Sequence, residues 1–128
     1  MEIEHFGGKM RCNNLETLDN LLSTRYGKGV NEFWIYGENK FPHMGILVNG
    51  DFAYIHYFQA EDQPGFRSVG TVAKLNENVF SVFYTNTIDE EIQISTDAVV
   101  LFPIALAAAK EFFLNPFEMP KNLEWFEL

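Results

Sequence analysis

Residues 44–58 read Met-Gly-Ile-Leu-Val-Asn-Gly-Asp-Phe-Ala-Tyr-Ile-His-Tyr-Phe. Two runs rich in β-branched and aromatic residues, 44–48 and 52–58, flank Asn49-Gly50-Asp51. Asn-Gly between two such runs favours a tight turn, because both central residues of that turn need a positive φ. We therefore predict an antiparallel hairpin that turns on Asn49-Gly50, and this hairpin organises the rest of the chain.

Further strand-like runs lie on both sides of the hairpin. They are identified by alternation of apolar and polar residues or by enrichment in β-formers. The run at 91–94 alternates cleanly and is predicted to be half-buried, and the run at 123–128 is predicted to point aromatic residues to both faces. The predicted strands are 33–36, 68–72, 79–84, 91–94 and 123–128.

Two segments show helical patterns. Residues 14–22 place Leu15, Leu18 and Leu22 on one face. Either Asn13 or Asn14 can cap this helix, Asn13 forming a capping-box-like pattern with Glu16, and Gly27 is the predicted stop, with Arg25 in the last turn.

A second helix is predicted with Pro103 in its first turn and residues 104–114 following, and Asn115-Pro116 ends it. It is apolar nearly all round, so we expect it to be largely buried, with its alanines allowing a close approach to a sheet. The order of elements predicts an α+β fold: one domain, 1–128, with a mainly antiparallel sheet and two principal helices on one face.

The composition limits the class of protein. Apolar residues make up 47% of the chain, and the net charge is −9, from 18 acidic and 9 basic residues. An acidic chain disfavours direct binding of nucleic acid. The start has no signal-peptide pattern, and no apolar stretch is long enough to span a membrane. We therefore expect a cytoplasmic protein, a location that one cysteine, Cys12, also fits.

Two features of the composition stand out. Aromatic residues make up 16% of the chain, and we expect most of the rings to lie in the core and some to form a binding surface. Residues 1–75 carry 9 acidic and 7 basic side chains, whereas residues 76–128 carry 9 and 2. This imbalance fits either simple solvation of a small domain or an acidic face that meets a basic partner.

Catalytic and metal-binding patterns were weighed against plainer interpretations. A turn on Asn49-Gly50 sets His43 opposite His56, and two adjacent imidazoles could bind a metal ion or share a proton. A catalytic zinc site, however, needs a third protein ligand. Cys12 has no base pattern beside it, and the run Asp89-Glu90-Glu91 is typical of a solvated turn. No phosphate-binding or nucleophile-elbow motif occurs. We predict no enzyme activity, no metal and no cofactor.

Residues 64–70, Pro-Gly-Phe-Arg-Ser-Val-Gly, combine turn residues, an aromatic ring, a guanidinium and a hydroxyl. They form a predicted loop, and loops on rigid scaffolds carry function disproportionately. An ordinary connection in the sheet, with Arg67 paired to a local carboxylate, explains the same residues equally well.

Four segments, 48–58, 64–70, 109–113 and 123–128, together resemble the first-numbered immunity family of bacterial polymorphic toxin systems. Members of that family resemble the immunity proteins encoded beside nucleic-acid deaminase toxins. The similarity covers about residues 30–128 and is carried by the order and spacing of the segments. It implies an α+β fold, no catalysis, and tight binding of one cognate toxin C-terminal domain by covering its active site or substrate groove.

An inhibitor of a nucleic-acid-modifying toxin gains from carboxylates that meet its basic groove and from aromatic anchors. We expect the toxin-binding residues in the 65–68 segment, the acidic run at 89–91 and the end of the chain. For Trp125, which also belongs to the resembling segments, a core position is favoured. The predicted toxin-binding residues are Gly65, Phe66, Arg67, Ser68, Asp89, Glu90, Glu91, Glu124 and Glu127.

Two other functions remain open from the sequence. One is a small-molecule-binding or enzymatic α+β domain with an aromatic-lined pocket, which a deep pocket containing His43 and His56 would favour. The other is a scaffold subunit that self-associates through aromatic patches. The sequence leaves the oligomeric state and the identity of the toxin open.

Overall fold

The central hairpin is formed by β4 (His43–Asn49) and β5 (Phe52–Phe58). In the computed structural model, which describes residues 1–71 and 79–128, Asn49 pairs with Phe52, so Gly50 and Asp51 are the central residues of the turn. Gly50 has a φ of 59°, which a two-residue hairpin turn with glycine in first place requires. The predicted turn on Asn49-Gly50 is therefore wrong by one position, because Asn49 still pairs with Phe52 in the ladder and Gly50 takes the first position of the turn. The Asn49 side chain donates a 3.0 Å hydrogen bond to the carbonyl of Val82.

This shift changes every cross-strand pair of the hairpin. His43 faces Phe58, and His56 faces Gly45. The predicted pairing of the two histidines is wrong, although both stay on the same face of the sheet, because the turn moves the pairing by two residues in total.

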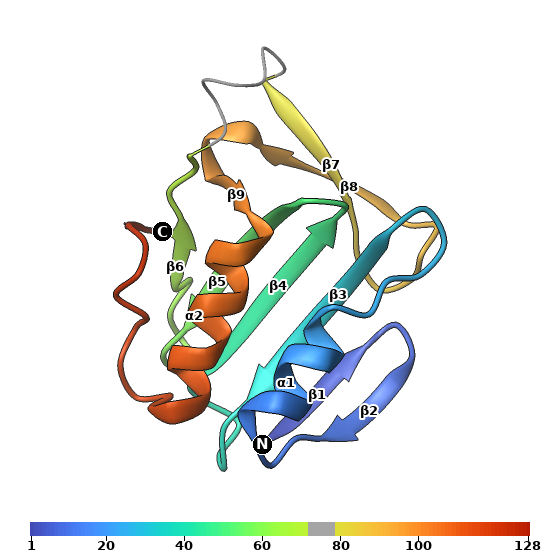
Figure 1. Cartoon of the computed structure of the whole chain (residues 1–128). Helices are drawn as coiled ribbons and strands as arrows, with labels where there is room; N and C mark the ends of the chain where they lie inside the picture. The colour runs from blue at the N-terminus through green and yellow to red at the C-terminus, as the bar shows by residue number, and fades with distance from the viewer. Residues whose placement is uncertain (72–78) are drawn as a thin grey trace.

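The hairpin is the middle of an eight-stranded antiparallel sheet (Figure 1). Seven strands follow the order β10-β6-β5-β4-β3-β1-β2, and the eighth, β9, also pairs with β5. A separate two-stranded sheet is formed by β7 and β8. The remaining strands are β1 (Glu2–His5), β2 (Gly8–Arg11), β3 (Val30–Tyr36), β6 (Phe66–Ser68), β7 (Phe80–Tyr84), β8 (Glu91–Ser95), β9 (Val99–Leu101) and β10 (Trp125–Glu127).

Both helices cover the same face of the sheet (Figure 1). They are α1 (Leu15–Leu22) and α2 (Phe102–Leu114), and a short 3-10 turn, Thr96–Ala98, precedes β9. Lys110 of α2 and Asp19 of α1 form a 2.8 Å ion pair between them. The predicted α+β architecture, with two helices on a mainly antiparallel sheet, is confirmed.

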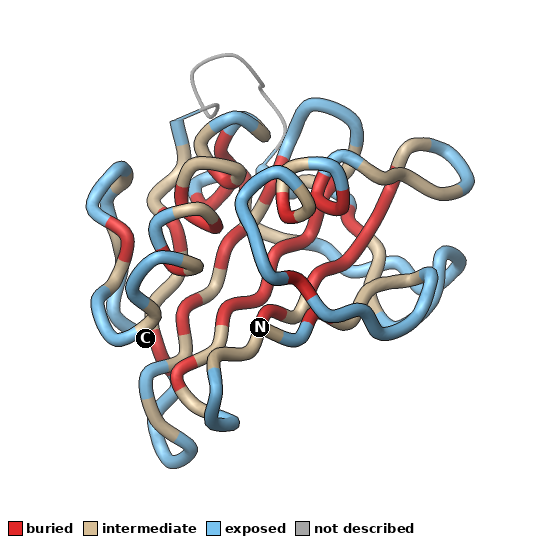
Figure 2. The backbone as a smooth tube through the Cα atoms, turned by 60° about the horizontal axis from the view of Figure 1, so that its bottom comes forward, coloured by how far each residue is buried: buried red, intermediate tan, exposed pale blue. Residues whose placement is uncertain are grey.

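The main core lies between the helices and the sheet. Figure 2 shows the buried residues running along the central strands. Ile46, Val48 and Ile55 of the hairpin face Ala105, Ala108 and Phe112 of α2, and all six are buried. The small alanine side chains let the helix lie close to the sheet, as the sequence predicts. Of the described residues, neither helix is long and apolar enough to cross a membrane.

The ends of α1 differ from the prediction in part. Asn14, not Asn13, caps the helix, since its side-chain oxygen accepts a 2.8 Å hydrogen bond from the amide of Thr17. The helix ends at Leu22, so Gly27 is not its stop and Arg25 lies beyond its last turn. At this end, the hydroxyls of Ser23 and Thr24 donate hydrogen bonds to the carbonyls of Asp19 and Asn20.

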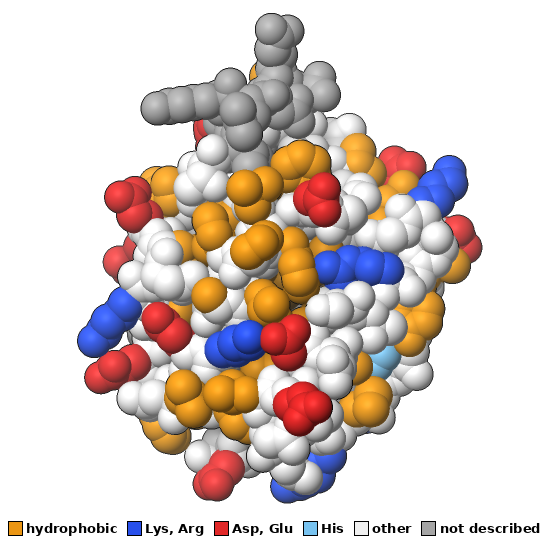
Figure 3. All heavy atoms as spheres, viewed as in Figure 1, with side chains coloured by type: hydrophobic (Ala, Val, Ile, Leu, Met, Phe, Trp, Pro, Cys, Tyr) orange, Lys and Arg blue, Asp and Glu red, His pale blue; other side chains and the backbone are white. Residues whose placement is uncertain are grey.

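α2 is buried along one side only. Leu114 is 70% exposed, and Figure 3 shows hydrophobic side chains gathered along the middle of the helix-bearing face. Although α2 is apolar nearly all round, it is not fully enclosed, because no further layer lies above it among residues 1–71 and 79–128. β8 is likewise more exposed than its alternation predicts, with Ile92 37% exposed.

Two further predictions change at residues 65–72. Residues 66–68 form the strand β6 rather than a loop, and the predicted strand 68–72 is not formed at 69–71; Val72 lies outside the described residues. The final strand is confirmed: Trp125 packs on the core, and Phe126 lies on the opposite face.

Candidate functional site

The face of the sheet without helices carries a row of half-buried rings. Strand alternation brings Trp34 and Tyr36 of β3, His43 of β4, and His56 and Phe58 of β5 to this face. We call these five residues the aromatic row. Its centroid distances are 3.9 Å for His56–Phe58, 4.6 Å for His43–Phe58, 5.3 Å for Tyr36–His43 and 6.2 Å for Trp34–Phe58.

Gly45 explains why Trp34 lies flat on the sheet. A Cβ at Gly45 would stand 2.6 Å from Cζ3 of the Trp34 ring, so the ring occupies the space that a side chain would take. The β7–β8 hairpin covers the other end of this face, where Phe83 packs with Leu47 and Val99 in a small second core. The aromatic row is thus the part of the face that no element covers among the described residues.

Both histidines of the row are held by internal hydrogen bonds. His56 Nε2 lies 2.7 Å from the Pro64 carbonyl and Nδ1 lies 3.1 Å from the Tyr54 hydroxyl, while His43 Nδ1 lies 3.1 Å from the Lys40 carbonyl. Burial lowers the pKa of both imidazoles below 6.5. Among the described residues, no group of three His, Cys, Asp or Glu side chains is placed to hold a metal ion.

Carboxylates border the row on the β1 side. Glu2 pairs with Tyr36 and Glu4 pairs with Trp34 in the sheet register. Burial raises the pKa of the Tyr36 hydroxyl, and the charges of Glu4, Glu2 and Glu32 raise it further. Lys9 lies 3.3 Å from Glu4, so part of this negative charge is compensated.

Six of the nine predicted toxin-binding residues lie at the opposite edge of the sheet. β6 pairs with β10, and this pairing brings residues 65–68 beside Glu124 and Glu127. Arg67 lies on the helix-free face, with its guanidinium 4.8 Å from the centroid of the Phe126 ring. Glu124, Phe126 and Glu127 are exposed.

The other three residues of the 65–68 segment are engaged within the fold. The Ser68 hydroxyl is buried, donates to the Ala98 carbonyl at 2.6 Å and accepts from the amide of Ile55 at 3.2 Å. Phe66 packs against the core. Gly65 has a φ of 85° and has no room for a Cβ beside the Tyr57 carbonyl.

Asp89, Glu90 and Glu91 form a separate exposed group at the β7–β8 turn. The Glu90 carboxylate accepts a 2.6 Å hydrogen bond from the side-chain amide of Asn86. Asp89 and Glu91 border a hollow with Lys28 and Val30, next to β3. Since β3 and β6 are separated by β4 and β5, the structure does not bring this acidic group together with Glu124 and Glu127.

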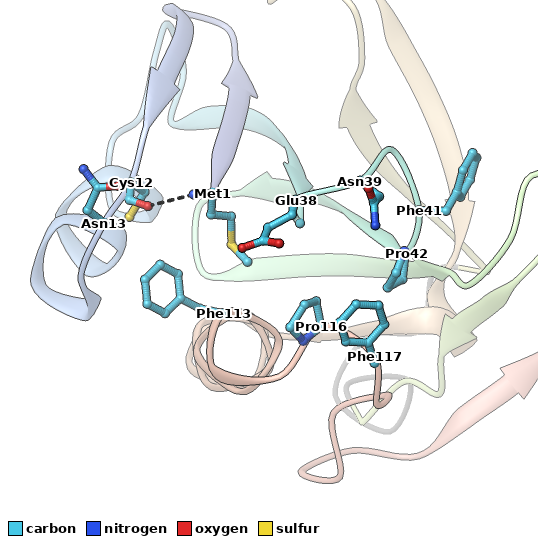
Figure 4. A pocket seen from close by; sticks show the side chains of 11 residues that line it. Met1, Cys12, Asn13, Glu38, Asn39, Phe41, Pro42, Phe113, Pro116 and Phe117 are labelled. Atoms are coloured by element: carbon cyan, nitrogen blue, oxygen red, sulfur yellow. Dashed lines mark hydrogen bonds between the residues drawn. The ribbon is translucent and has the colours of Figure 1, made fainter.

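A groove of about 380 Å³ opens at the end of α2 (Figure 4). We call it the Phe117 groove. Three chain segments form it: the N-terminal residues and those after β2, the β3–β4 connection, and the residues at the end of α2. Its lining residues are Met1, Cys12, Asn13, Gly37, Glu38, Asn39, Phe41, Pro42, Phe113, Pro116 and Phe117.

The groove combines rings with a carboxylate. Phe117 is 73% exposed, and Phe113 and Phe41 are half-buried. Figure 4 shows the Glu38 carboxylate beside Met1 and directed over Pro116. The amino group of Met1 points away toward the carbonyl of Cys12, 3.2 Å from it. Neither His43 nor His56 lines this groove.

Sequence reasoning did not single out the aromatic row or the Phe117 groove. Trp34 and Tyr36 alternate within a strand-like run, which indicates a common face, but their partners on β4 and β5 depend on the register. Phe117 follows the helix-ending Asn115-Pro116, and a large ring just beyond a helix end is a pattern that deserves notice.

No family model matches the chain. The chain is 30% identical over 129 residues to the double-stranded DNA deaminase immunity protein of Burkholderia cenocepacia (strain H111), and the match covers 100% of both chains. The similarity therefore runs through every element described above.

Proposed function

This chain belongs to the family of the double-stranded DNA deaminase immunity proteins, and we propose that it binds and neutralises a cognate deaminase toxin domain. The observation that carries the proposal is the full-length match, which includes every helix and strand of residues 1–71 and 79–128. It supports the immunity-family resemblance found in the segments at 48–58, 64–70, 109–113 and 123–128. In this proposal the chain acts by binding and catalyses no reaction.

We propose that binding covers the active site or the substrate groove of the toxin domain. A deaminase that acts on DNA must hold phosphates with basic side chains and bring the target base out of the stack. A chain with a net charge of −9 competes electrostatically for the same basic surface. Occlusion therefore requires no chemistry from the immunity protein itself.

The proposed contact region is the helix-free face and the β6–β10 edge. The aromatic row and Phe126 supply partly exposed rings, which are the residue types that anchor protein interfaces. Arg67, Glu124 and Glu127 supply charges at that edge. Asp89, Glu90 and Glu91 lie too far along the sheet to belong to the same small patch, and we propose that they steer association through their charge.

The test is co-expression with the C-terminal domain encoded by the adjacent gene. We expect the two chains to co-elute from a sizing column, the complex to weaken at about 0.5 M salt through screening, and growth to be rescued from the toxicity of that domain. A titration of the chain into a double-stranded DNA deamination assay then tests neutralisation directly. A toxic domain that neither co-elutes nor loses activity contradicts the proposal.

The alternative of a small-molecule-binding domain receives less support. Both ring nitrogens of His56 are engaged by Tyr54 and Pro64, which leaves this imidazole without a free nitrogen for a ligand. The alternative of a self-associating scaffold is tested on the same sizing column, where the free chain would elute as a dimer at micromolar concentration.

A further inference from the structure

We propose that the Phe117 groove receives an arginine side chain from the deaminase toxin domain, with Glu38 pairing its guanidinium. The inference rests on the proposed function and adds a specific contact to it. It concerns a surface at the end of α2, outside all nine residues predicted from the sequence.

Large apolar side chains are exposed at this end of the molecule. Phe117 is 73% exposed and Leu114 is 70% exposed, and they are three residues apart in the chain. Phe41 and Phe113 add half-buried rings from the β3–β4 connection and from α2. A group of exposed apolar side chains with a polar rim is typical of a surface that a partner covers.

The groove also carries charge. Glu38 carries the carboxylate among its lining side chains, and it forms no ion pair within the described part of the chain. The amides of Asn13 and Asn39 complete the polar rim. The Met1 amino group is the positive charge of the lining, and its hydrogen bond to Cys12 directs it away from Glu38.

An arginine side chain matches the groove in shape and chemistry. An arginine side chain has an apolar stem that packs on rings and a planar guanidinium that binds a carboxylate with two hydrogen bonds. A volume of about 380 Å³ holds such a side chain together with part of its neighbours. Arginine therefore uses both the ring-lined floor and the carboxylate of this groove, whereas a purely apolar side chain uses only the floor.

The chain itself pairs arginine with phenylalanine at other places on its surface. The Arg25 guanidinium lies 4.4 Å from the centroid of the Phe102 ring, and the Arg67 guanidinium lies 4.8 Å from that of Phe126. These contacts show the same kind of packing, an attraction between a cation and a ring face, at partly exposed sites. A domain that binds DNA contacts the phosphates with arginine and lysine side chains, so arginine is available on the surface that the immunity protein would cover.

The test measures binding of the co-expressed deaminase domain to four variants of the full chain. Phe117→Ala removes the ring, and Glu38→Gln removes the charge with little change in shape. Glu61→Gln, in the exposed β5–β6 connection, and Phe80→Ala, which removes an exposed ring from β7 in the separate two-stranded sheet, are matched controls. We expect Phe117→Ala to weaken binding at least about tenfold, mainly through faster dissociation, with unchanged thermal stability.

We expect Glu38→Gln to weaken binding several-fold and to reduce its salt dependence, and the controls to bind as the unmodified chain does. Loss with Phe117→Ala but not with Glu38→Gln overturns the arginine in favour of an apolar occupant. Unchanged binding by both variants overturns the groove while the immunity function stands. If the unmodified chain fails to bind the deaminase domain, the proposed function and this inference fall together.

Discussion

The imidazole of His56 lies flat on the ring of Phe58, with 3.9 Å between the ring centroids and 4° between the ring planes. His43 lies directly across the strand pair from Phe58, with 4.6 Å between the ring centroids. The aromatic row therefore encloses two titratable rings. Their uncharged forms fit this setting better than their charged forms do.

The first prediction concerns pH. Burial lowers the pKa of His43 and His56 from 6.5, and the charge of His43 lowers that of His56 further, whereas their backbone partners act in the opposite direction. Between the lowered pKa and 6.5 the unfolded chain binds more protons than the folded one. The free energy of unfolding therefore falls as the pH falls from about 7.5 to 5.5. Urea unfolding at both pH values measures the loss.

The double variant His43→Asn/His56→Asn is the comparison for this prediction. We expect it to be less stable than the unmodified chain at the higher pH but to lose less stability on acidification. His5, whose pKa is also lowered by burial, accounts for part of the remaining slope. An identical slope in both proteins would show that the aromatic row does not carry the pH dependence.

The second prediction concerns the close approach of Trp34 and Gly45. Gly45→Ala forces the indole ring away from the sheet, and we expect a loss of about 1–3 kcal/mol in the free energy of unfolding, as for other overpacked sites. In the background of Trp34→Leu, the same substitution should cost less, because the ring it displaces is gone. Additive losses in this double-mutant cycle would contradict the contact.

The third prediction decides between two neighbouring asparagines. Asn14→Ala removes the oxygen that accepts from the Thr17 amide, and we expect a loss of about 1 kcal/mol in the free energy of unfolding. Asn13→Ala, a matched change one residue away, should leave the free energy of unfolding nearly unchanged. Equal losses would show that the cap is shared between the two side chains.

The fourth prediction concerns Glu32, a carboxylate that is only 5% exposed. It accepts hydrogen bonds from the Thr85 hydroxyl at 2.5 Å and from the backbone N–H of Asn86 at 3.1 Å, and so holds the β7–β8 turn against β3. Glu32→Gln should cost about 1.5–3 kcal/mol, the range for hydrogen bonds to a charged group. Hydrogen exchange in β7 and β8 should rise more than in β4 and β5.

Glu90→Gln is the control for Glu32. Glu90 accepts from the Asn86 side chain in the same turn, but it is exposed. We expect a change close to zero. A large loss for Glu90→Gln would show that any change in this turn is costly, whichever carboxylate is altered.

The fifth prediction tests the predicted acidic residues at the end of the chain. Glu124→Lys/Glu127→Lys should weaken toxin binding at low salt, because it places two positive charges at the β6–β10 edge. Asp89→Lys/Glu90→Lys should mainly slow association. Affinity at low salt that is unchanged by Glu124→Lys/Glu127→Lys would remove those two residues from the interface.

Local patterns in the sequence were sufficient for the fold class, although they did not predict the strands β1, β2 and β9. The leucine spacing in α1, Pro103 at the start of α2 and the two runs around Gly50 are each decided within a few residues. The exact register of the hairpin was not decided by the sequence, because both Asn49-Gly50 and Gly50-Asp51 are compatible with a two-residue hairpin turn, and the structure uses the second. A one-position error in the turn was enough to misplace His43 against His56.

The candidate site was less accessible from the sequence. Pro64-Gly65 favours a turn, yet residues 66–68 form a strand because β10 supplies the pairing partner from the far end of the chain. The aromatic content predicts a ring-filled core, but among the 13 Phe, 5 Tyr and 2 Trp only Phe33, Tyr57, Phe83 and Phe112 are buried. Which rings stay at the surface is decided by which face of the sheet the helices cover.

Cys12, the single cysteine of the chain, gives the molecule an internal probe. Its thiol is buried, donates to the Asn14 carbonyl at 3.3 Å and stands in the wall of the Phe117 groove. A thiol reagent reaches it only when the segment between β2 and α1 opens, so the rate of modification reports the free energy of that opening. A partner bound in the groove would slow this reaction, so the rate at which the Cys12 thiol is modified would report binding of that partner.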